Sequence, residues 1–380
     1  MKKRKIFFSL LVLTTFFMAC QKKWAPPIGL DIGKLEANIH HELEGKVVGY
    51  GWAAYRDGEL ISSGGKGWAR AEGYDSDPSA YTANTSSTIF STTKTITAAS
   101  FIENLEEWGI SLEDKIWNYL PAAWTKDRSL SNVTFKQLLK HTSGLDGTFD
   151  RYTQMRNQVA NVGLTGTIGD WNYANINYTL FRVLIPNIMN SNMVDQKIQE
   201  SDQAIVDYCA YLYENFVSTK MAKAGMPGFQ YISTNYLEAL PKTLYYNFDT
   251  YKNGPSTNAK GQLMFDCHDI SGAGGWFMSP VQYAAFIDGL FNNKLLDAPS
   301  LQIMKDEQLG MFPTTGKYGT YYTHNGGGGW GTQGKGGQSI WMHYPHANVS
   351  LFITWNSLNN DLSKTRRALI KDVFDEAYTD

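Results

Sequence analysis

Apolar residues recur with two different periods at the start of this chain. From residue 31 to 43 they lie three or four positions apart, which is the spacing of an amphipathic helix. These positions are Ile32, Leu35, Ile39 and Leu43. Two segments rich in strand-forming residues follow, 47–55 and 60–69, with an Asp57-Gly58 turn signal between them. The pattern therefore predicts a helix followed by a β-hairpin.

The middle of the chain has helical spacing, and strand-like spacing returns near the C-terminus. Predicted helices cover 91–106, 134–139, 203–216 and 280–291. Predicted strands cover 318–323, 339–343 and 348–355, and a last amphipathic helix covers 362–378. Helix and strands therefore come from both ends of the chain, with helices between them.

This order of elements predicts an α/β (α+β) fold in which both ends of the chain build one antiparallel sheet. The N- and C-terminal helices flank the sheet, and an all-helical lobe is inserted. We expect the α/β lobe to comprise about 31–75 and 268–380, and the helical lobe about 76–267. The cleft between the lobes is then the default ligand site.

The composition is that of a globular protein with an ordinary core. Of the 380 residues, 43% are hydrophobic and 18% are charged, and the formal net charge is −2. General disorder is excluded, and no basic excess indicates nucleic acid. No Cys/His spacing indicates a metal site. We therefore expect no cofactor, no metal and no nucleic acid, and a small-molecule or peptide substrate as the partner.

The first residues form a targeting segment rather than part of the fold. Four basic residues precede an apolar stretch, 6–18, that is too short to span a bilayer. This is the pattern of a signal peptide, 1–19. Cys20 follows as in a bacterial lipoprotein processing box, so 20–30 would be a lipidated tether before a folded domain, 31–380. We expect a lipid-anchored protein of the bacterial cell envelope, facing the periplasm or the exterior; an ordinary signal peptide is the alternative.

Two cysteines remain beyond this segment, Cys209 and Cys267. They are too few for a disulfide-dependent fold. Two separate buried thiols are favoured over a pair, although the sequence leaves both open.

Ser91 and Lys94 are three positions apart at the start of a predicted helix. Both side chains then lie on one helix face. A serine nucleophile needs a neighbour that takes its proton, and a desolvated lysine is such a neighbour. Taken alone, this pair is also explained by a helix start with an exposed lysine.

Other short motifs follow in a fixed order. They are the turn His141-Thr142-Ser143-Gly144-Leu145, Tyr173-Ala174-Asn175, Gly274-Gly275 and, after a predicted strand, His324-Asn325-Gly326. Together with Ser91 and Lys94, they resemble the serine β-lactamase and penicillin-binding-protein-like family, in its branch of class C β-lactamases, D-alanyl-D-alanine carboxypeptidases and esterases. The resemblance covers the chain from about Asp31 to the last helix.

The resemblance implies a role for each of these residues. Ser91 is the acyl-accepting nucleophile, Lys94 assists its deprotonation, and Tyr173 is the second proton-transfer group. Asn175 holds the amide side chain of the substrate. The oxyanion hole is formed by the backbone N–H groups of Ser91 and Gly327.

The third motif, His324, Asn325 and Gly326, would contact substrate from the strand that borders the cleft. The resemblance gives His324 an electrostatic role near the substrate carboxylate or near the tyrosine. Asn325 stands where threonine or serine is usual, which puts carboxylate recognition in doubt. A rival third motif begins at Lys335, but it lies inside a glycine-rich stretch rather than after a strand.

The glycine-rich stretch, 325–337, is longer than the family's usual link between strands. As a loop it is either a flexible surface segment or a mobile wall of the cleft, with Trp330 covering an apolar substrate. Trp276 is a second candidate wall. The resemblance makes the turn at His141 structural rather than catalytic.

The resemblance therefore implies a secreted serine hydrolase that acts through an acyl-enzyme on an ester, an amide or a D-amino-acid peptide. The histidine-led third motif and the glycine-rich stretch favour a peptidase or esterase over a dedicated β-lactamase. A true class C-type β-lactamase and a non-catalytic penicillin-binding-like envelope protein are the alternatives.

Overall fold

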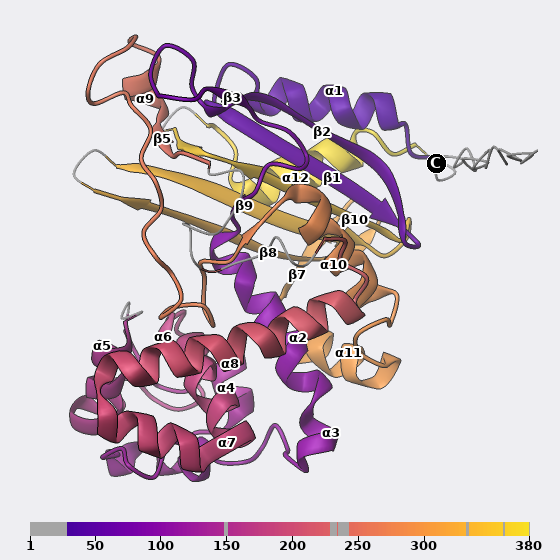
Figure 1. Cartoon of the computed structure of the whole chain (residues 1–380). Helices are drawn as coiled ribbons and strands as arrows, with labels where there is room; N and C mark the ends of the chain where they lie inside the picture. Colours follow the sequence, from indigo (N-terminus) through magenta and orange to yellow (C-terminus); the bar gives the residue numbers. More distant parts are fainter. Residues whose placement is uncertain are drawn as a thin grey trace, which may run out of the picture.

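The centre of the computed structural model is a largely antiparallel sheet (Figure 1). The structure describes residues 29–147, 151–228, 234, 243–331, 334–359 and 362–379. In these ranges the sheet has nine strands in the order β11-β5-β9-β10-β1-β2-β3, while β8 also pairs with β9 and β7 with β8. They are β1 (Gly49–Arg56), β2 (Glu59–Arg70), β3 (Ser79–Ala80), β5 (Tyr246–Asn247), β7 (Phe312–Gly316), β8 (Gly319–Trp330), β9 (Lys335–Tyr344), β10 (Val349–Trp355) and β11 (Ser357–Leu358).

The predicted N-terminal hairpin is present. Asp57 and Gly58 join β1 to β2 with φ angles of 52° and 85°, the left-handed pair that a tight hairpin turn requires. On its other side β1 pairs with β10, with Trp52 opposite Ile353. Both ends of the chain therefore build the sheet, which confirms the predicted fold class.

Alternation along the strands places helices on both faces of the sheet. On β10, Leu351 and Ile353 pack against α1 (Ile32–Leu43) and α12 (Arg366–Asp375). Phe352, between them, packs with Tyr283 of α10 (Pro280–Phe291), their ring centroids 4.5 Å apart. The terminal helices thus cover one face, and the other joins the core of the helical lobe.

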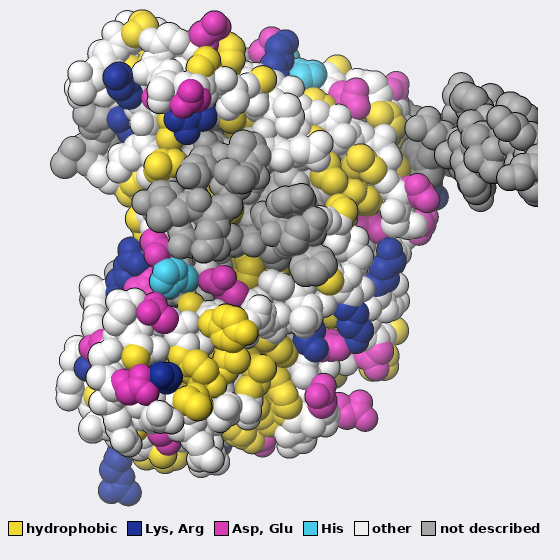
Figure 2. All heavy atoms as spheres, in the orientation of Figure 1, with side chains coloured by type: hydrophobic (Ala, Val, Ile, Leu, Met, Phe, Trp, Pro, Cys, Tyr) yellow, Lys and Arg dark blue, Asp and Glu magenta, His cyan; other side chains and the backbone are white. Residues whose placement is uncertain are grey.

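The helical lobe is the lower part of the molecule in Figure 1. Its helices are α2 (Thr93–Glu103), α3 (Leu105–Trp108), α4 (Phe135–Leu139), α5 (Tyr152–Asn157), α6 (Ile176–Thr179), α7 (Phe181–Glu200) and α8 (Asp202–Lys223). Two further helices are α9 (Phe248–Tyr251) and α11 (Ala298–Asp306). Thr134 caps α4 through a capping box, as its position before the helix predicts. Figure 2 shows charges of both signs interspersed on the face drawn there, in keeping with the small net charge.

Three details differ from the sequence prediction. The predicted helix 91–106 is a short 3₁₀ turn, Phe90–Thr92, followed by α2 and α3. The strands β3 and β5 belong to the sheet, although both fall within the predicted helical range 76–267. The C-terminal helix is shorter than 362–378.

The loop prediction for the glycine-rich stretch is wrong. Gly326 to Trp330 continue β8, and β9 begins at Lys335, so most of the stretch is two paired strands. Glycine lowers strand propensity, but here the neighbouring strand supplies the hydrogen-bond partners, and close packing leaves no room for side chains. A Cβ on Gly336 would lie 2.0 Å from the Gly328 carbonyl oxygen.

The remaining predictions concern the two cysteines and the N-terminal targeting segment. Cys209 and Cys267 are separate buried thiols that form no disulfide, as favoured above. The signal segment 1–19 and Cys20 lie outside the described residues. Within the described part, the structure contains no helix that is both long and apolar enough to cross a bilayer.

Candidate active site

Ser91 lies on a sharp turn between a short strand and a helix. The strand β4 (Ser87–Thr88) pairs with β6 (Phe277–Met278), and the 3₁₀ turn Phe90–Thr92 leads from there into α2. Phe90 has a φ angle of 51°, a left-handed conformation that is unusual for a large side chain. Such strain persists where the surrounding structure enforces it, often at functional sites. The turn presents Ser91, partly exposed, at the start of α2.

Lys94 is fully buried one turn further along. Its ammonium donates hydrogen bonds to Asn175 Oδ1 at 2.9 Å and to the carbonyl oxygen of Ala273 at 2.8 Å. It lies 5.0 Å from the ring centroid of Tyr173. No carboxylate among the described residues forms an ion pair with it. An ammonium has three protons, so these two hydrogen bonds leave one of them unused.

Tyr173 lies between two histidines. Its ring centroid is 4.5 Å from that of His141 and 6.4 Å from that of His324. The His141 ring is buried, and its Nδ1 lies 3.3 Å from both Asn177 Nδ2 and the backbone nitrogen of Ala174. Its place behind the tyrosine agrees with the structural role expected for it.

His324 is uncharged in this site. Its Nδ1–H donates to the carbonyl oxygen of Asn325 at 2.9 Å. Burial, and then the positive charge of Lys94, lower the His324 pKa to about 3. The electrostatic role expected above would need a protonated ring, so a neutral ring with an unprotonated Nε2 is what the site offers. That Nε2 is buried and has no partner among the described residues. Positive charges near the ring come from Lys94 and from Arg367 and Arg366 of α12. Arg367 lines the same cavity as His324.

The edge of β8 lies directly against the Ser91 turn. A Cβ on Gly326 would be 2.6 Å from the Ser91 backbone nitrogen, so only glycine lets the strand approach this closely. The Ser339 hydroxyl, opposite on β9, donates to the carbonyl oxygen of Ile89 at 2.6 Å. From the other side Arg366 donates to the Gly326 carbonyl oxygen at 2.6 Å. These contacts fix the strand beside the serine.

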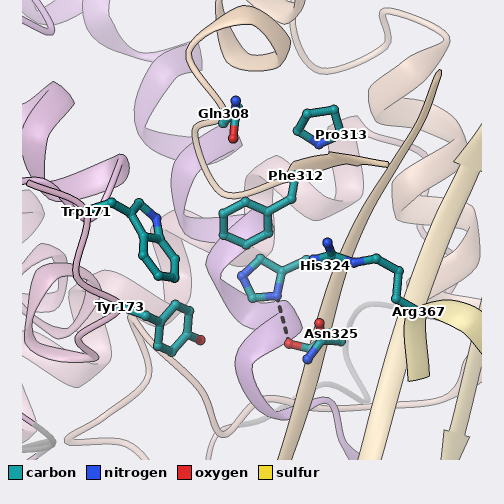
Figure 3. A pocket seen from close by; sticks show the side chains of 8 residues that line it. All are labelled: Trp171, Tyr173, Gln308, Phe312, Pro313, His324, Asn325 and Arg367. Carbon is teal, nitrogen blue, oxygen red and sulfur yellow. Dashed lines mark hydrogen bonds between the residues drawn. The ribbon is translucent and has the colours of Figure 1, made fainter. Parts of the chain in front are cut away.

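Two cavities are lined by residues of this site. The first, the serine cavity, has a volume of about 200 Å³ and is lined by Phe90, Ser91, Asn175, Met264, Phe265, Ile270, Ala273, Gly274, Gly275, Gly327, Gly328, Gly329 and Trp330. The second, the tyrosine cavity, has a volume of about 580 Å³ and is lined by Trp171, Tyr173, Gln308, Phe312, Pro313, His324, Asn325 and Arg367 (Figure 3). Figure 3 shows Trp171 and Tyr173 facing Phe312 and His324 across it. The predicted site residues that line these cavities therefore come from three separate parts of the chain, around Ser91, Tyr173 and His324.

Two alternatives from the sequence can now be placed. Trp276 is wrong as a cleft wall, because it is fully buried and donates its Nε1–H to the Ser271 carbonyl oxygen at 3.0 Å. Trp330 does line the serine cavity. Lys335 starts β9 opposite Trp330 and lines neither cavity, so the motif at His324 is the one that reaches the site.

The loop that carries Ala273 is held by residues that the sequence did not single out. Thr97, one turn beyond Lys94, donates to the Gly272 carbonyl oxygen at 2.7 Å and bonds the Tyr213 hydroxyl at 2.6 Å. Arg182, fully buried, donates from Nε to the His268 carbonyl oxygen at 3.2 Å. The sequence could have indicated Thr97, because it lies three positions after Lys94 on the same helix. No pattern in the neighbouring sequence indicates a role for Arg182.

Comparisons with known proteins agree with this architecture. A family model described as Beta-lactamase matches residues 35–374. PbpX of Bacillus subtilis (strain 168), which is named as a penicillin-binding protein, is 22% identical over 310 residues, covering 78% of this chain and 70% of PbpX.

Solved structures share the fold at low identity. The D-amino acid amidase from Ochrobactrum anthropi SV3, complexed with L-phenylalanine amide, matches with a TM-score of 0.62 and 18% identity, covering 91% of this chain and 96% of the amidase. A β-lactamase/D-alanine carboxypeptidase from Pseudomonas syringae matches with a TM-score of 0.63 and 15% identity, covering 91% and 99%. The family model spans most of the length of this chain. The chain therefore belongs to the β-lactamase family and is a serine hydrolase.

Proposed function

We propose that this chain forms an acyl-enzyme on Ser91 and hydrolyses esters, amides or D-amino-acid peptides rather than serving as a dedicated β-lactamase. The observation that carries the proposal is the burial of Lys94 between Asn175 and Ala273, beneath Tyr173 and one turn after the serine. A buried lysine without a carboxylate partner is costly to keep, and a role in proton transfer accounts for it.

In the proposed reaction, Ser91 Oγ attacks the substrate carbonyl carbon, and its proton passes to the Tyr173 oxygen, assisted by the positive charge of Lys94. The backbone N–H groups of Ser91 and Gly327 would bind the oxyanion; losing one such donor typically lowers the rate about 10²–10³-fold. The bond to the leaving group then breaks, and the leaving atom takes the proton from Tyr173. Water then attacks the acyl carbonyl and gives a proton to the Tyr173 oxygen, which returns it to Ser91 Oγ as the bond between Oγ and the acyl carbon breaks.

Asn175 and the third motif would orient the substrate. Asn175 accepts from Lys94 through Oδ1, so its amide nitrogen remains to donate to a substrate carbonyl. His324 is neutral, and Asn325 replaces the usual hydroxyl residue. Both features weaken recognition of a substrate carboxylate, such as the one that penicillins and cephalosporins carry. They are why we rank hydrolysis of esters, and of amides or peptides without that carboxylate, above β-lactam hydrolysis.

Parallel assays with p-nitrophenyl butyrate, a D-alanyl-D-alanine peptide and nitrocefin test this ranking. We expect the ester or the peptide to have a kcat/KM at least about tenfold above that of nitrocefin, a difference of about 1.4 kcal/mol in transition-state binding. Faster turnover of nitrocefin would identify a β-lactamase instead. Failure of all three, together with no labelling by a fluorophosphonate probe, would favour the non-catalytic envelope protein.

We further propose that the enzyme works at the bacterial cell envelope, anchored through lipid on Cys20. The support is the sequence pattern of a basic start, a short apolar stretch and a following cysteine. Metabolic labelling with palmitate should mark the wild-type chain and spare Cys20→Ala; equal label on both would refute the anchor.

A further inference from the structure

The two cavities differ in what a reaction would place in them. The serine cavity holds Ser91 and Gly327, whose backbone N–H groups would bind the oxyanion, so the acyl carbonyl has to enter there. The tyrosine cavity holds Tyr173, which would protonate the leaving atom. On the proposed function, the acyl group therefore occupies the serine cavity and the leaving group occupies the tyrosine cavity.

The walls of the serine cavity are apolar. Phe90, Phe265 and Trp330 form an aromatic cluster, with ring centroids 6.5 Å apart for Phe90 and Trp330 and 6.2 Å apart for Phe265 and Trp330. Tyr245 also packs against Trp330, with their ring centroids 5.0 Å apart. Met264 adds a flexible apolar side chain at the same wall. No charged side chain is among the described residues that line this cavity.

The acidic residues closest in sequence to this wall are already paired. Asp269 forms an ion pair with Arg151, whose guanidinium also lies 4.9 Å from the Phe265 ring centroid. Asp266 Oδ1 lies 2.7 Å from His268 Nδ1. The charge next to Ser91 is the Lys94 ammonium, which repels a second cation. An α-ammonium on the acyl group would therefore be desolvated with no counter-ion among the residues that the structure describes.

We propose that the acyl group of the substrate is uncharged and apolar, and that Trp330 selects it by covering the serine cavity. This inference deepens the proposed function and rests on it. It separates this enzyme from hydrolases of free D-amino acid amides, whose acyl groups carry an α-ammonium. Trp330 is positioned for the task because the extended β8–β9 hairpin brings it over the Ser91 turn, against Phe90.

A matched pair of esters tests the charge preference. The p-nitrophenyl esters of 3-phenylpropionic acid and D-phenylalanine share one skeleton and differ by the α-ammonium. At about pH 6 that group is charged, since an α-amino pKa is about 7.7–8.0. We expect kcat/KM to be at least about tenfold higher for the uncharged ester. Equal rates, or a faster aminoacyl ester, would overturn the inference.

The role of Trp330 is tested by Trp330→Ala with the 3-phenylpropionyl and acetyl esters. We expect the preference for the larger acyl group to fall about tenfold. Trp171→Ala, which alters the tyrosine cavity, should leave that ratio unchanged. Phe265 lines the same cavity from a different segment of the chain, so Phe265→Ala should also lower this ratio of kcat/KM values. The inference can therefore be tested even if the Trp330 variant does not fold.

Failure of the inference is distinguishable from failure of the proposed function. Labelling of wild-type Ser91 by a fluorophosphonate, with hydrolysis of the acetyl ester, would confirm the acyl-enzyme on its own. If both occur and Trp330→Ala and Phe265→Ala leave acyl preference unchanged, the inference is wrong and the proposed function stands. If neither occurs, both are wrong.

Discussion

Replacing Ser91 with alanine is expected to lower kcat/KM for the best ester substrate by about 10⁴–10⁶-fold, the range seen when a serine nucleophile is removed. The Ser91 hydroxyl forms no hydrogen bond with the described residues, so its loss removes the reacting atom without breaking a structural contact. The turn itself is held by the Tyr283 hydroxyl, which donates to the Thr92 carbonyl oxygen at 2.8 Å. We therefore expect the melting temperature to stay within a few degrees of wild type.

The measurement combines steady-state ester hydrolysis, fluorophosphonate labelling and thermal unfolding. Ser131→Ala is the matched control, because Ser131 is an exposed serine of the helical lobe that lines neither cavity. Label and activity should vanish in Ser91→Ala and persist in Ser131→Ala. Retention of label on Ser91→Ala would mean that another nucleophile reacts, and the proposed mechanism would be withdrawn.

The architecture was readable from the sequence because its signals are local. The helix from 32 to 43, the Asp57-Gly58 turn and the capped helix after Thr134 each depend on periodicity or turn chemistry within a few residues. The order of these elements then determined the sheet and the inserted lobe. The Ser91 and Lys94 pair was visible for the same reason, since both residues lie on one helical turn.

What the sequence could not provide depends on contacts between distant segments. The glycine-rich stretch has poor strand propensity, yet it forms paired strands because Gly326 has to pass within van der Waals distance of the Ser91 backbone. The neutral state of His324 follows from burial and from Lys94, which is 230 positions away in the chain. Trp276 looked like Trp330 in the sequence, and only packing separates the buried one from the one in the cavity.

Replacing Lys94 with methionine is expected to lower kcat/KM by about 10²–10⁴-fold, the usual contribution of a positioned proton-transfer group. Methionine is also unbranched and fits the same buried channel. Two effects on stability oppose each other. Removing a buried charge without a carboxylate partner is favourable, but Asn175 Oδ1 and the Ala273 carbonyl oxygen lose their donor, at about 1–3 kcal/mol each. These two effects partly offset each other, so we expect the variant to remain folded at 25 °C while its activity falls.

The matched control is Lys335→Met, because Lys335 is the other lysine considered for this site and is likewise buried, although it lines neither cavity. We expect Lys335→Met to keep most of the wild-type rate of fluorophosphonate labelling, and Lys94→Met to lose it while remaining folded by thermal unfolding. If Lys335→Met lost labelling and Lys94→Met kept it, the third motif would be the one that begins at Lys335 rather than the one at His324. Rapid labelling of a folded Lys94→Met would show that Tyr173 activates the serine without the lysine. Tyr173 is the candidate because its ring lies next to the Lys94 ammonium and lines the tyrosine cavity.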